Sequence, residues 1–497
     1  MSTMDFAARD YDFMPYIACR NWIGGRWQDA CDGATLDVLN PRHGKVIGQM
    51  AMGGAADVAE AVKSAEAALE GWRQTPVKER AQVLFRLKAL MERDLEELTW
   101  LLSHENGKTY AEAKASVLKG IECVEMGTSL PNMIAGEQLD VSRGVNCEVT
   151  YEPLGVCAGI IPFNFPTMVP LWMIPQVLVG GNTFVLKPSE QVPYGSMKLA
   201  LLLKEAGLPD GVLNIVNGAR DAVEAICDHP GIAAVGFVGS TRVARIVYER
   251  CAKTAKRVLC LGGAKNHLIV TPDADLELTA PNVVASSFGC AGQRCMAASV
   301  MLAVGDVDHI IARMVEVASS MVLGEDMGAI INEASVARIS GYIDGAAAAG
   351  ATILVDGRAA SVDGSEGYWL GPTIIDHVTP DMPASCEEIF GPVLSIIRVK
   401  TVDEAIAIEN SSGYGNAAAI FTGNGAVARY AMERVSAGMC GVNIGVPVPR
   451  EPFAFGGWNH SKFGHGDMTG MDGFRFWTRP RKVTSKWATQ TDQNWMS

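Results

Sequence analysis

The chain has 497 residues, 48% hydrophobic and 20% charged, which is typical of a globular protein too long for a single core. Its formal net charge of −13 disfavours binding to nucleic acid or to an anionic membrane. The longest apolar stretch, residues 168–179, contains Pro170 and Pro175 and is too short to span a bilayer. We therefore expect two or three domains and neither a nucleic acid nor a membrane as partner.

The cysteines and histidines limit the chemistry further. The 12 cysteines form no CxxC pair, so we expect reduced thiols and a cytoplasmic protein. The 8 histidines show no metal-ligand spacing, which predicts no metal site. The N-terminal segment carries Asp5, Arg9 and Asp10 without a long apolar run, and we expect no signal peptide there.

The first 150 residues combine short strands, helices and an exposed hairpin. Gly24 and Gly25 between Trp22 and Trp27 predict a hairpin. Apolar spacing predicts helices over 56–71 and over 77–103. Residues 105–108 predict a helix stop, and a new helix follows them to about residue 130. Residues 137–151 alternate apolar and polar and predict an exposed hairpin that forms an arm.

The rest of the chain alternates strands with helices, which predicts parallel α/β sheets. The first series has strands at 155–161, 182–187, 212–216, 233–238, 258–261 and 267–270, with a helix over 241–251. The second series has helices at 308–320, 334–349, 402–409 and 426–435 and strands at 352–355, 394–399 and 417–421. The tail, 474–487, alternates again and could be a strand added to a neighbour.

A Gly-flanked cysteine lies between the two series. Cys295 follows Arg294 in the segment 287–297, which contains Gly289 and Gly292. A neighbouring cation lowers the pKa of a thiol and favours the nucleophilic thiolate. The alternative is one more buried structural cysteine, and this segment alone leaves both interpretations open.

Three other groups suit ligand binding. Lys187 with Glu190, and the helix start at 239–241, suit a dinucleotide, although GxGxxG is absent and ordinary loops remain an alternative. Asn164, between two prolines, either stabilises an oxyanion or bonds its own turn. The pair Glu387–Glu388 is either a solvated edge or a ribose ligand.

Taken together, these segments resemble the aldehyde dehydrogenase superfamily over nearly the whole chain. The matching segments, in the family's order, are 162–166 (PFNFP), 187–190 (KPSE), 237–241 (FVGST), 292–295 (GQRC) and 388–392 (EIFGP). The chain is more closely similar to the CoA-acylating methylmalonate-semialdehyde dehydrogenase branch. That narrower match lies in 169–175 (VPLWMIP), 263–267 (GAKNH), 292–297 (GQRCMA) and 445–449 (GVPVP).

The resemblance implies an α/β fold with a nucleotide-binding domain, a catalytic domain and a β-arm for oligomerisation. The implied divisions are 1–132 with 151–263, then 264–456, then 133–150 with 457–497. It also implies NAD as cofactor, CoA as co-substrate, a small aldehyde substrate and a homodimer or homotetramer. The implied catalytic roles are Cys295 as nucleophile and Asn164 with the Cys295 N–H as oxyanion donors. The implied cofactor contacts are Lys187 and Glu190 at the adenosine ribose, Gly239 and Ser240 at the pyrophosphate, Glu388 at the nicotinamide ribose, Phe390 at the nicotinamide, and Phe163 as a further cofactor-binding residue.

Departures from the family pattern bear on the last step and on the substrate. Cys260 replaces the Glu that hydrolytic relatives use as a base for water, and 466–468 lacks their Arg-Glu pair. Lys119 replaces an arginine of the acylating branch and, with Arg294, is a candidate ligand for a substrate carboxylate. We expect a semialdehyde dehydrogenase that passes its acyl group to CoA. The alternatives are a hydrolytic aldehyde dehydrogenase and a catalytically silent homologue.

Overall fold

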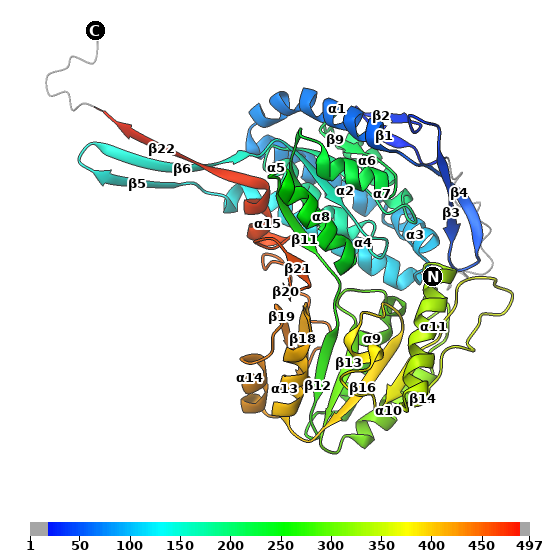
Figure 1. The fold of residues 1–497 in the computed structure, drawn as a ribbon. Coiled ribbons are helices and arrows are strands. Elements are labelled where there is room, and N and C mark those ends of the chain that lie inside the picture. The colour runs from blue at the N-terminus through cyan, green and yellow to red at the C-terminus, as the bar shows by residue number, and fades with distance from the viewer. Residues whose placement is uncertain (1–17, 488–497) are drawn as a thin grey trace, which may run out of the picture.

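The computed structural model describes residues 18–487, which form two stacked α/β lobes and a long projecting β-arm (Figure 1). The expectation for Asp5, Arg9 and Asp10 lies outside the described residues. No described helix is both long and apolar enough to cross a membrane. The predicted α/β fold with a β-arm is confirmed.

An eight-stranded sheet forms the centre of the first lobe, in the order β2-β1-β9-β8-β7-β10-β11-β21. The middle strands are parallel and almost wholly buried, as expected for a sheet covered on both faces. Its strands are β1 (Asn21–Ile23), β2 (Arg26–Gln28), β7 (Val156–Ile160), β8 (Thr183–Lys187), β9 (Leu213–Ile215), β10 (Ile232–Val238), β11 (Arg257–Leu261) and β21 (Lys462–Phe463).

Helices cover both faces of this sheet. Side chains that alternate along each strand pack into two separate clusters, so each face has its own core. One face carries α2 (Val77–Arg93), α3 (Leu95–Asn106), α4 (Tyr110–Met133), α5 (Met168–Val179) and α6 (Tyr194–Glu205). The other carries α1 (Ala55–Gln74), α7 (Arg220–Asp228) and α8 (Thr241–Lys253).

The second lobe contains a seven-stranded sheet in the order β14-β15-β16-β13-β12-β18-β19, parallel except for the edge strand β14. Its strands are β12 (Asn266–Val270), β13 (Ala298–Val304), β14 (Thr352–Val355), β15 (Thr373–Asp376), β16 (Val393–Val399), β18 (Ala417–Phe421) and β19 (Met439–Val442). The helices are α9 (Leu276–Phe288), α10 (Asp308–Ser319), α11 (Glu333–Ala348), α12 (Pro383–Cys386), α13 (Val402–Ser411) and α14 (Gly425–Met432).

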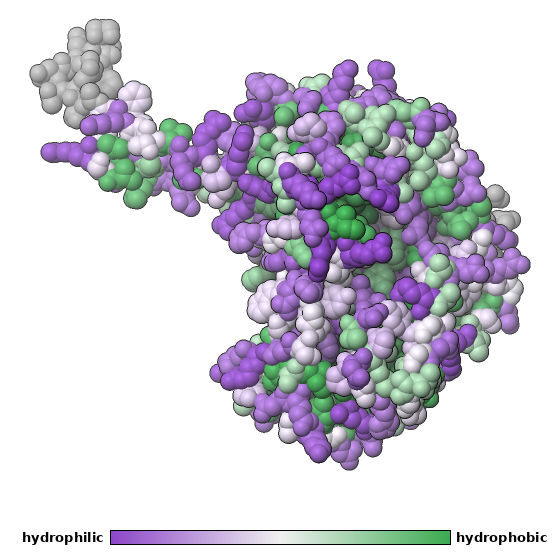
Figure 2. Space-filling view, in the orientation of Figure 1, coloured by the Kyte–Doolittle hydropathy of each residue, from purple (hydrophilic) through white to green (hydrophobic). Residues whose placement is uncertain are grey.

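The arm consists of β5 (Glu137–Ser142), β6 (Val145–Pro153) and β22 (Thr478–Lys486). The tail strand β22 therefore pairs with the arm of its own chain. The arm exposes apolar side chains among polar ones, including Leu139 at 67% (Figure 2). Two separate pairs complete the strands: β3 (Thr35–Asn40) with β4 (Lys45–Ala51), and β17 (Tyr414–Gly415) with β20 (Trp458–Asn459).

Two sequence predictions were wrong in detail. The single helix predicted over 77–103 divides at Asp94, whose carboxylate binds Lys198 Nζ of α6 at 2.8 Å. Asp competes for local hydrogen bonds and favours such helix ends. The tail strand predicted from residue 474 begins only at Thr478, because α15 (Gly470–Trp477) buries Phe474 and Trp477 against the first lobe.

Asn182 ties three parts of the first lobe together. Its Oδ1 accepts from the N–H groups of Leu154, at 2.7 Å, and Gly155, at 3.0 Å, just before β7. Its Nδ2 donates to the Trp477 carbonyl at 2.9 Å, where α15 ends. The residue is fully buried, so water cannot replace these bonds.

We expect Asn182→Ala to destabilise the protein, because it leaves buried polar backbone groups unpaired at roughly 1–3 kcal/mol each. The unfolding temperature should fall by at least about 5 °C in a thermal denaturation experiment. Asn410→Ala is the matched control, because Asn410 is exposed and makes one bond to the Arg434 carbonyl. An equal fall in unfolding temperature for both variants would contradict the structural role assigned to Asn182.

Candidate functional site

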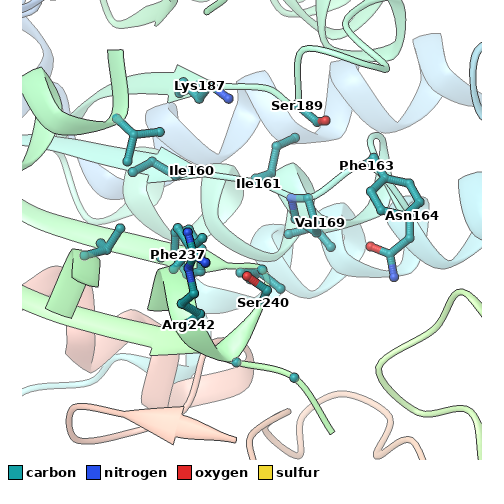
Figure 3. A pocket seen from close by; sticks show the side chains of 18 of the residues that line it. Ile160, Ile161, Phe163, Asn164, Val169, Lys187, Ser189, Phe237, Ser240 and Arg242 are labelled. Carbon is teal, nitrogen blue, oxygen red and sulfur yellow. The ribbon is translucent and has the colours of Figure 1, made fainter. Parts of the chain in front are cut away.

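A cavity of about 850 Å³ opens at the carboxyl ends of β7, β8 and β10, where the two lobes face each other. This volume suits a cofactor-sized ligand, and this edge is where α/β sheets bind ligands. Figure 3 shows side chains of the first lobe that surround it, among them Asn164, Lys187 and Ser240. The second lobe contributes Cys295, Arg338, Glu388 and Phe390.

Asn164 and the Cys295 loop meet at one end of the cavity. The side-chain amide of Asn164 donates to the backbone carbonyl of Gln293 at 2.9 Å, and not to its own turn. Gln293 is itself fixed, since its side chain donates to the Ala329 carbonyl at 3.1 Å and accepts from the Ile331 N–H at 3.0 Å. Asn164 is therefore held beside the segment that carries Cys295.

Residues at the turn between α3 and α4 bind the backbone of the segment that carries Asn164. Lys108 Nζ donates to the Asn164 carbonyl at 2.5 Å and lies 3.7 Å from the ring centroid of Phe165. Asn106 Nδ2 donates to the Phe163 carbonyl at 2.7 Å. From the sequence, residues 105–108 were expected only to end a helix, although their run of polar side chains was a signal of a role at this site.

The backbone before Cys295 adopts an unusual conformation. Cys290 and Ala291 both have φ in the left-handed region, at 54° and 53°, which is costly for residues with a Cβ. The Cys290 N–H donates to Glu112 Oε1 at 2.5 Å, which stabilises this turn. A Cβ on Gly292 would lie 2.0 Å from the Gly391 carbonyl oxygen, so only glycine fits there.

The thiol of Cys295 is less acidic than expected. Burial, together with the negative charge of Glu388, raises the pKa of Cys295 to about 12, although the N–H groups of Cys295 and Met296 favour the thiolate. Arg294 opposes this shift only weakly; its guanidinium donates to carbonyls of α9, including that of Ala285 at 2.6 Å. Arg294 therefore does not give Cys295 the lowered pKa that its neighbouring position in the sequence suggests.

The other end of the cavity carries the predicted dinucleotide groups. Lys187 Nζ lies 3.1 Å from Glu190 Oε2, at the end of β8. Gly239 and Ser240 precede α8, whose first turn receives no side-chain cap, so its N–H groups are available to an anion.

Glu388 and two aromatic rings also line the cavity. Glu388 Oε1 accepts from the Ala264 N–H at 2.9 Å, and burial raises the pKa of Glu388 to about 7. Its neighbour Glu387 is exposed and bonds the Tyr342 hydroxyl, so the two carboxylates have different environments. The rings of Phe163 and Phe390 meet edge to face, with centroids 5.7 Å apart.

The two candidates for a substrate carboxylate are not among the residues that line this cavity. Lys119 Nζ lies 2.6 Å from Glu451 and 3.0 Å from Glu122, so its charge is already compensated. The guanidinium of Arg294 faces α9.

Cys260 cannot serve as a base. It is fully buried in β11 and packs in the apolar cluster beneath α1, α7 and α8, where burial raises its pKa well above the usual range. Among residues 18–487, no group of three or more His, Cys, Asp or Glu is arranged to hold a metal ion.

Comparison with known proteins supplies the family. The profile described as "Aldehyde dehydrogenase family" matches residues 27–483. Malonate-semialdehyde dehydrogenase 2 of Geobacillus kaustophilus is 45% identical, over 94% of this chain and 98% of its own length. Malonate-semialdehyde dehydrogenase 2 of Bacillus cereus is 46% identical with the same coverage.

Solved structures give the same result. A Sinorhizobium meliloti 1021 protein, assigned as a methylmalonate-semialdehyde dehydrogenase and solved with NAD, has a TM-score of 0.94 and 40% identity, covering 95% of this chain and 99% of that chain. The methylmalonate-semialdehyde dehydrogenase of Oceanimonas doudoroffii has a TM-score of 0.93 and 41% identity, with the same coverage. These names agree with the predicted branch. The chain belongs to the aldehyde dehydrogenase family.

Proposed function

We propose that this protein is an NAD-dependent aldehyde dehydrogenase that oxidises a small carboxylated semialdehyde and releases the product as an acyl-CoA. The names of its relatives support a substrate of malonate- or methylmalonate-semialdehyde type. The observation that carries the proposal is one cavity with Cys295 and Asn164 at one end and dinucleotide-binding groups at the other.

The residues of this cavity fit NAD. Lys187 and Glu190 would hold the adenosine ribose, and the uncapped start of α8 after Ser240 would take the pyrophosphate. Glu388 would hold the nicotinamide ribose, and Phe390 would pack against the nicotinamide. When bound there, NAD supplies the acceptor for the hydride that leaves the substrate carbon.

The protein itself supplies the nucleophile and the oxyanion stabilisation. The Cys295 sulfur loses its proton and attacks the aldehyde carbon. The Asn164 amide has a second N–H besides the one bonded to Gln293, and with the Cys295 N–H it would stabilise the oxyanion. Loss of hydride then leaves a thioester on Cys295.

The last step transfers the acyl group from this thioester to an acceptor, which is either CoA or water. Water needs a positioned base, and such help is worth about 10²–10⁴-fold. The residue in the position of that base, Cys260, is packed in the core with a raised pKa. CoA brings a thiol that is intrinsically more nucleophilic, so we propose CoA as the acceptor.

We also propose that the substrate carboxylate approaches Lys119. Lys119 extends from α4, which packs along α5, and Val169 and Trp172 of α5 line the cavity with Cys295. Phe455, four residues after Glu451, contacts Trp172 with ring centroids 4.6 Å apart. Glu451 therefore competes with a substrate carboxylate for Lys119.

We further propose a cytoplasmic homodimer or homotetramer. All twelve cysteines are free thiols, which suits a reducing compartment. The arm of β5, β6 and β22 exposes Leu139 and Val141, at 67% and 51%, and would pack against another subunit.

Without CoA, an aldehyde and NAD should give a rapid burst of NADH equal to the Cys295 concentration and then a slow steady rate. CoA should raise the steady rate, and mass spectrometry should detect acyl-CoA. Cys295→Ala should abolish NADH formation but retain NAD binding. An equal steady rate without CoA, with only free acid as product, would favour the hydrolytic alternative. No NADH with any aldehyde would favour a silent homologue.

NAD should be preferred over NADP, because the carboxylate of Glu190 would repel a 2′-phosphate. Glu190→Gln should reduce this preference by roughly tenfold, since one like-charge contact near a protein surface costs that much or more. The measurement is kcat/KM for both cofactors at fixed ionic strength. A higher value with NADP for the wild type would overturn the assignment of Glu190.

Glu451→Gln should favour carboxylated substrates, because it frees the charge of Lys119. The ratio of kcat/KM for malonate semialdehyde to that for propanal should rise by about tenfold. Glu122→Gln is the control, because the Glu122 side chain is 45% exposed against 14% for Glu451. An unchanged or lower ratio in Glu451→Gln would remove Lys119 from the substrate site.

A further inference from the structure

Glu388 lines the same cavity as Cys295. Its Oε1 accepts from the Ala264 N–H at 2.9 Å. A Cβ on Gly263 would lie 2.1 Å from Oε2, so the glycine allows this close approach. Within residues 18–487, Oε2 receives no hydrogen bond from the protein, and Glu388 lines the cavity.

Residues 264–266 contact both Glu388 and the backbone of Cys295. Asn266, two residues after Ala264, donates from Nδ2 to the Cys295 carbonyl at 2.8 Å. Two residues of extended chain span at most about 7 Å. The carboxylate and the thiol line the same cavity on segments that Asn266 connects, and the negative charge of Glu388 contributes to the raised pKa of Cys295.

The other carboxylates that line the cavity are paired with cations. Glu190 pairs with Lys187 at 3.1 Å, and Glu224 pairs with Arg220 at 2.7 Å and with Arg250 at 3.0 Å. In the described part of the chain, Glu388 has no cation within ion-pair distance. It is the lining carboxylate that remains available for proton transfer beside Cys295.

Four titratable or charged groups face Glu388. Lys265 donates from Nζ to the Ala384 carbonyl at 2.9 Å, and Arg338 donates to a carbonyl at 2.6 Å, so both cations are held by other partners. The third is the Cys295 thiol. The last is Tyr414, whose phenol pKa is raised by burial and by Glu388.

Burial raises the pKa of Glu388 to about 7, although the Ala264 N–H, Lys265 and Arg338 favour its charged form. A general base works best when its pKa lies near the operating pH. The carboxylate form is the active base, so activity that depends on it rises with pH through about 7.

Resting on the proposed function, we propose that Glu388 is the general base of the acyl transfer from Cys295 to CoA. In this proposal CoA uses the same cavity as the cofactor, so it enters after NADH has left and the carboxylate no longer holds a ribose. The CoA S–H proton moves to Glu388 while the CoA sulfur attacks the thioester carbon. The bond from that carbon to Cys295 then breaks, and the departing sulfur takes the proton back from Glu388. Acyl-CoA leaves, and the thiol and carboxylate are restored.

The test avoids NAD, because Glu388 is also a cofactor residue. Cys295 is acylated with p-nitrophenyl propionate, mass spectrometry verifies the acyl-enzyme, and acyl-CoA formation is followed by rapid quench after CoA is added. The wild-type rate should rise with pH, level off above about 7 and show a solvent deuterium isotope effect above unity. In Glu388→Gln the rate at pH 6.5 should fall by about 10²-fold. It should then rise continuously towards the ionisation of the CoA thiol.

Two further variants complete the experiment. Glu388→Asp keeps a carboxylate and should recover part of the wild-type rate of acyl-CoA formation and the plateau of that rate at high pH. Glu387→Gln removes the same charge one residue away, where the carboxylate bonds Tyr342, and should behave as wild type. A Glu388→Gln acyl-enzyme with the wild-type rate and pH profile, or a wild-type isotope effect of unity, would overturn the role of Glu388. A wild-type acyl-enzyme that forms no acyl-CoA would instead overturn CoA as the acceptor.

Discussion

The hydrogen bond from the Asn164 amide to the Gln293 carbonyl joins the two lobes at the reacting end of the cavity. Asn164 follows β7 in the first lobe, and Gln293 belongs to the loop that leads to Cys295 and β13 in the second. The α3–α4 turn and the first turn of α4 contact both sides: Lys108 donates to the Asn164 carbonyl, and Glu112 accepts from the Cys290 N–H. The distance between nucleophile and oxyanion donor therefore depends on how the lobes are packed, because no single element carries both.

Burial controls the chemistry that this arrangement allows. It raises the pKa of Cys295 to about 12 and that of Glu388 to about 7, and it lowers the pKa of Lys265 to about 7. Each shift has the same cause, which is the cost of keeping a charge away from water. Each shift opposes the charged form of its group, so proton transfer between neighbouring groups matters for the chemistry of this site.

The C-terminal segment shows how one stretch serves two structural roles. Trp477 is completely buried, its carbonyl accepts from Asn182, and its ring lies 5.9 Å from that of Phe184. One residue later the chain becomes β22 and extends the arm. The exposed arm is thus anchored at its base by a fully buried residue of the first lobe.

The sequence by itself determined the α/β class, most strands and helices, the exposed arm and the family, because these depend on local periodicity and on short motifs. It also identified Cys295, Asn164 and Glu388 as candidates, since each stands in a family motif. Only the tertiary structure decided the break at Asp94, the helix that ends at Trp477, the support from Lys108 and the direction of the Cys295 pKa shift. It likewise showed that Lys119 pairs with Glu451, more than 300 positions away in the chain. The physical reason is that burial and charge pairing depend on residues distant in sequence, which local patterns do not specify.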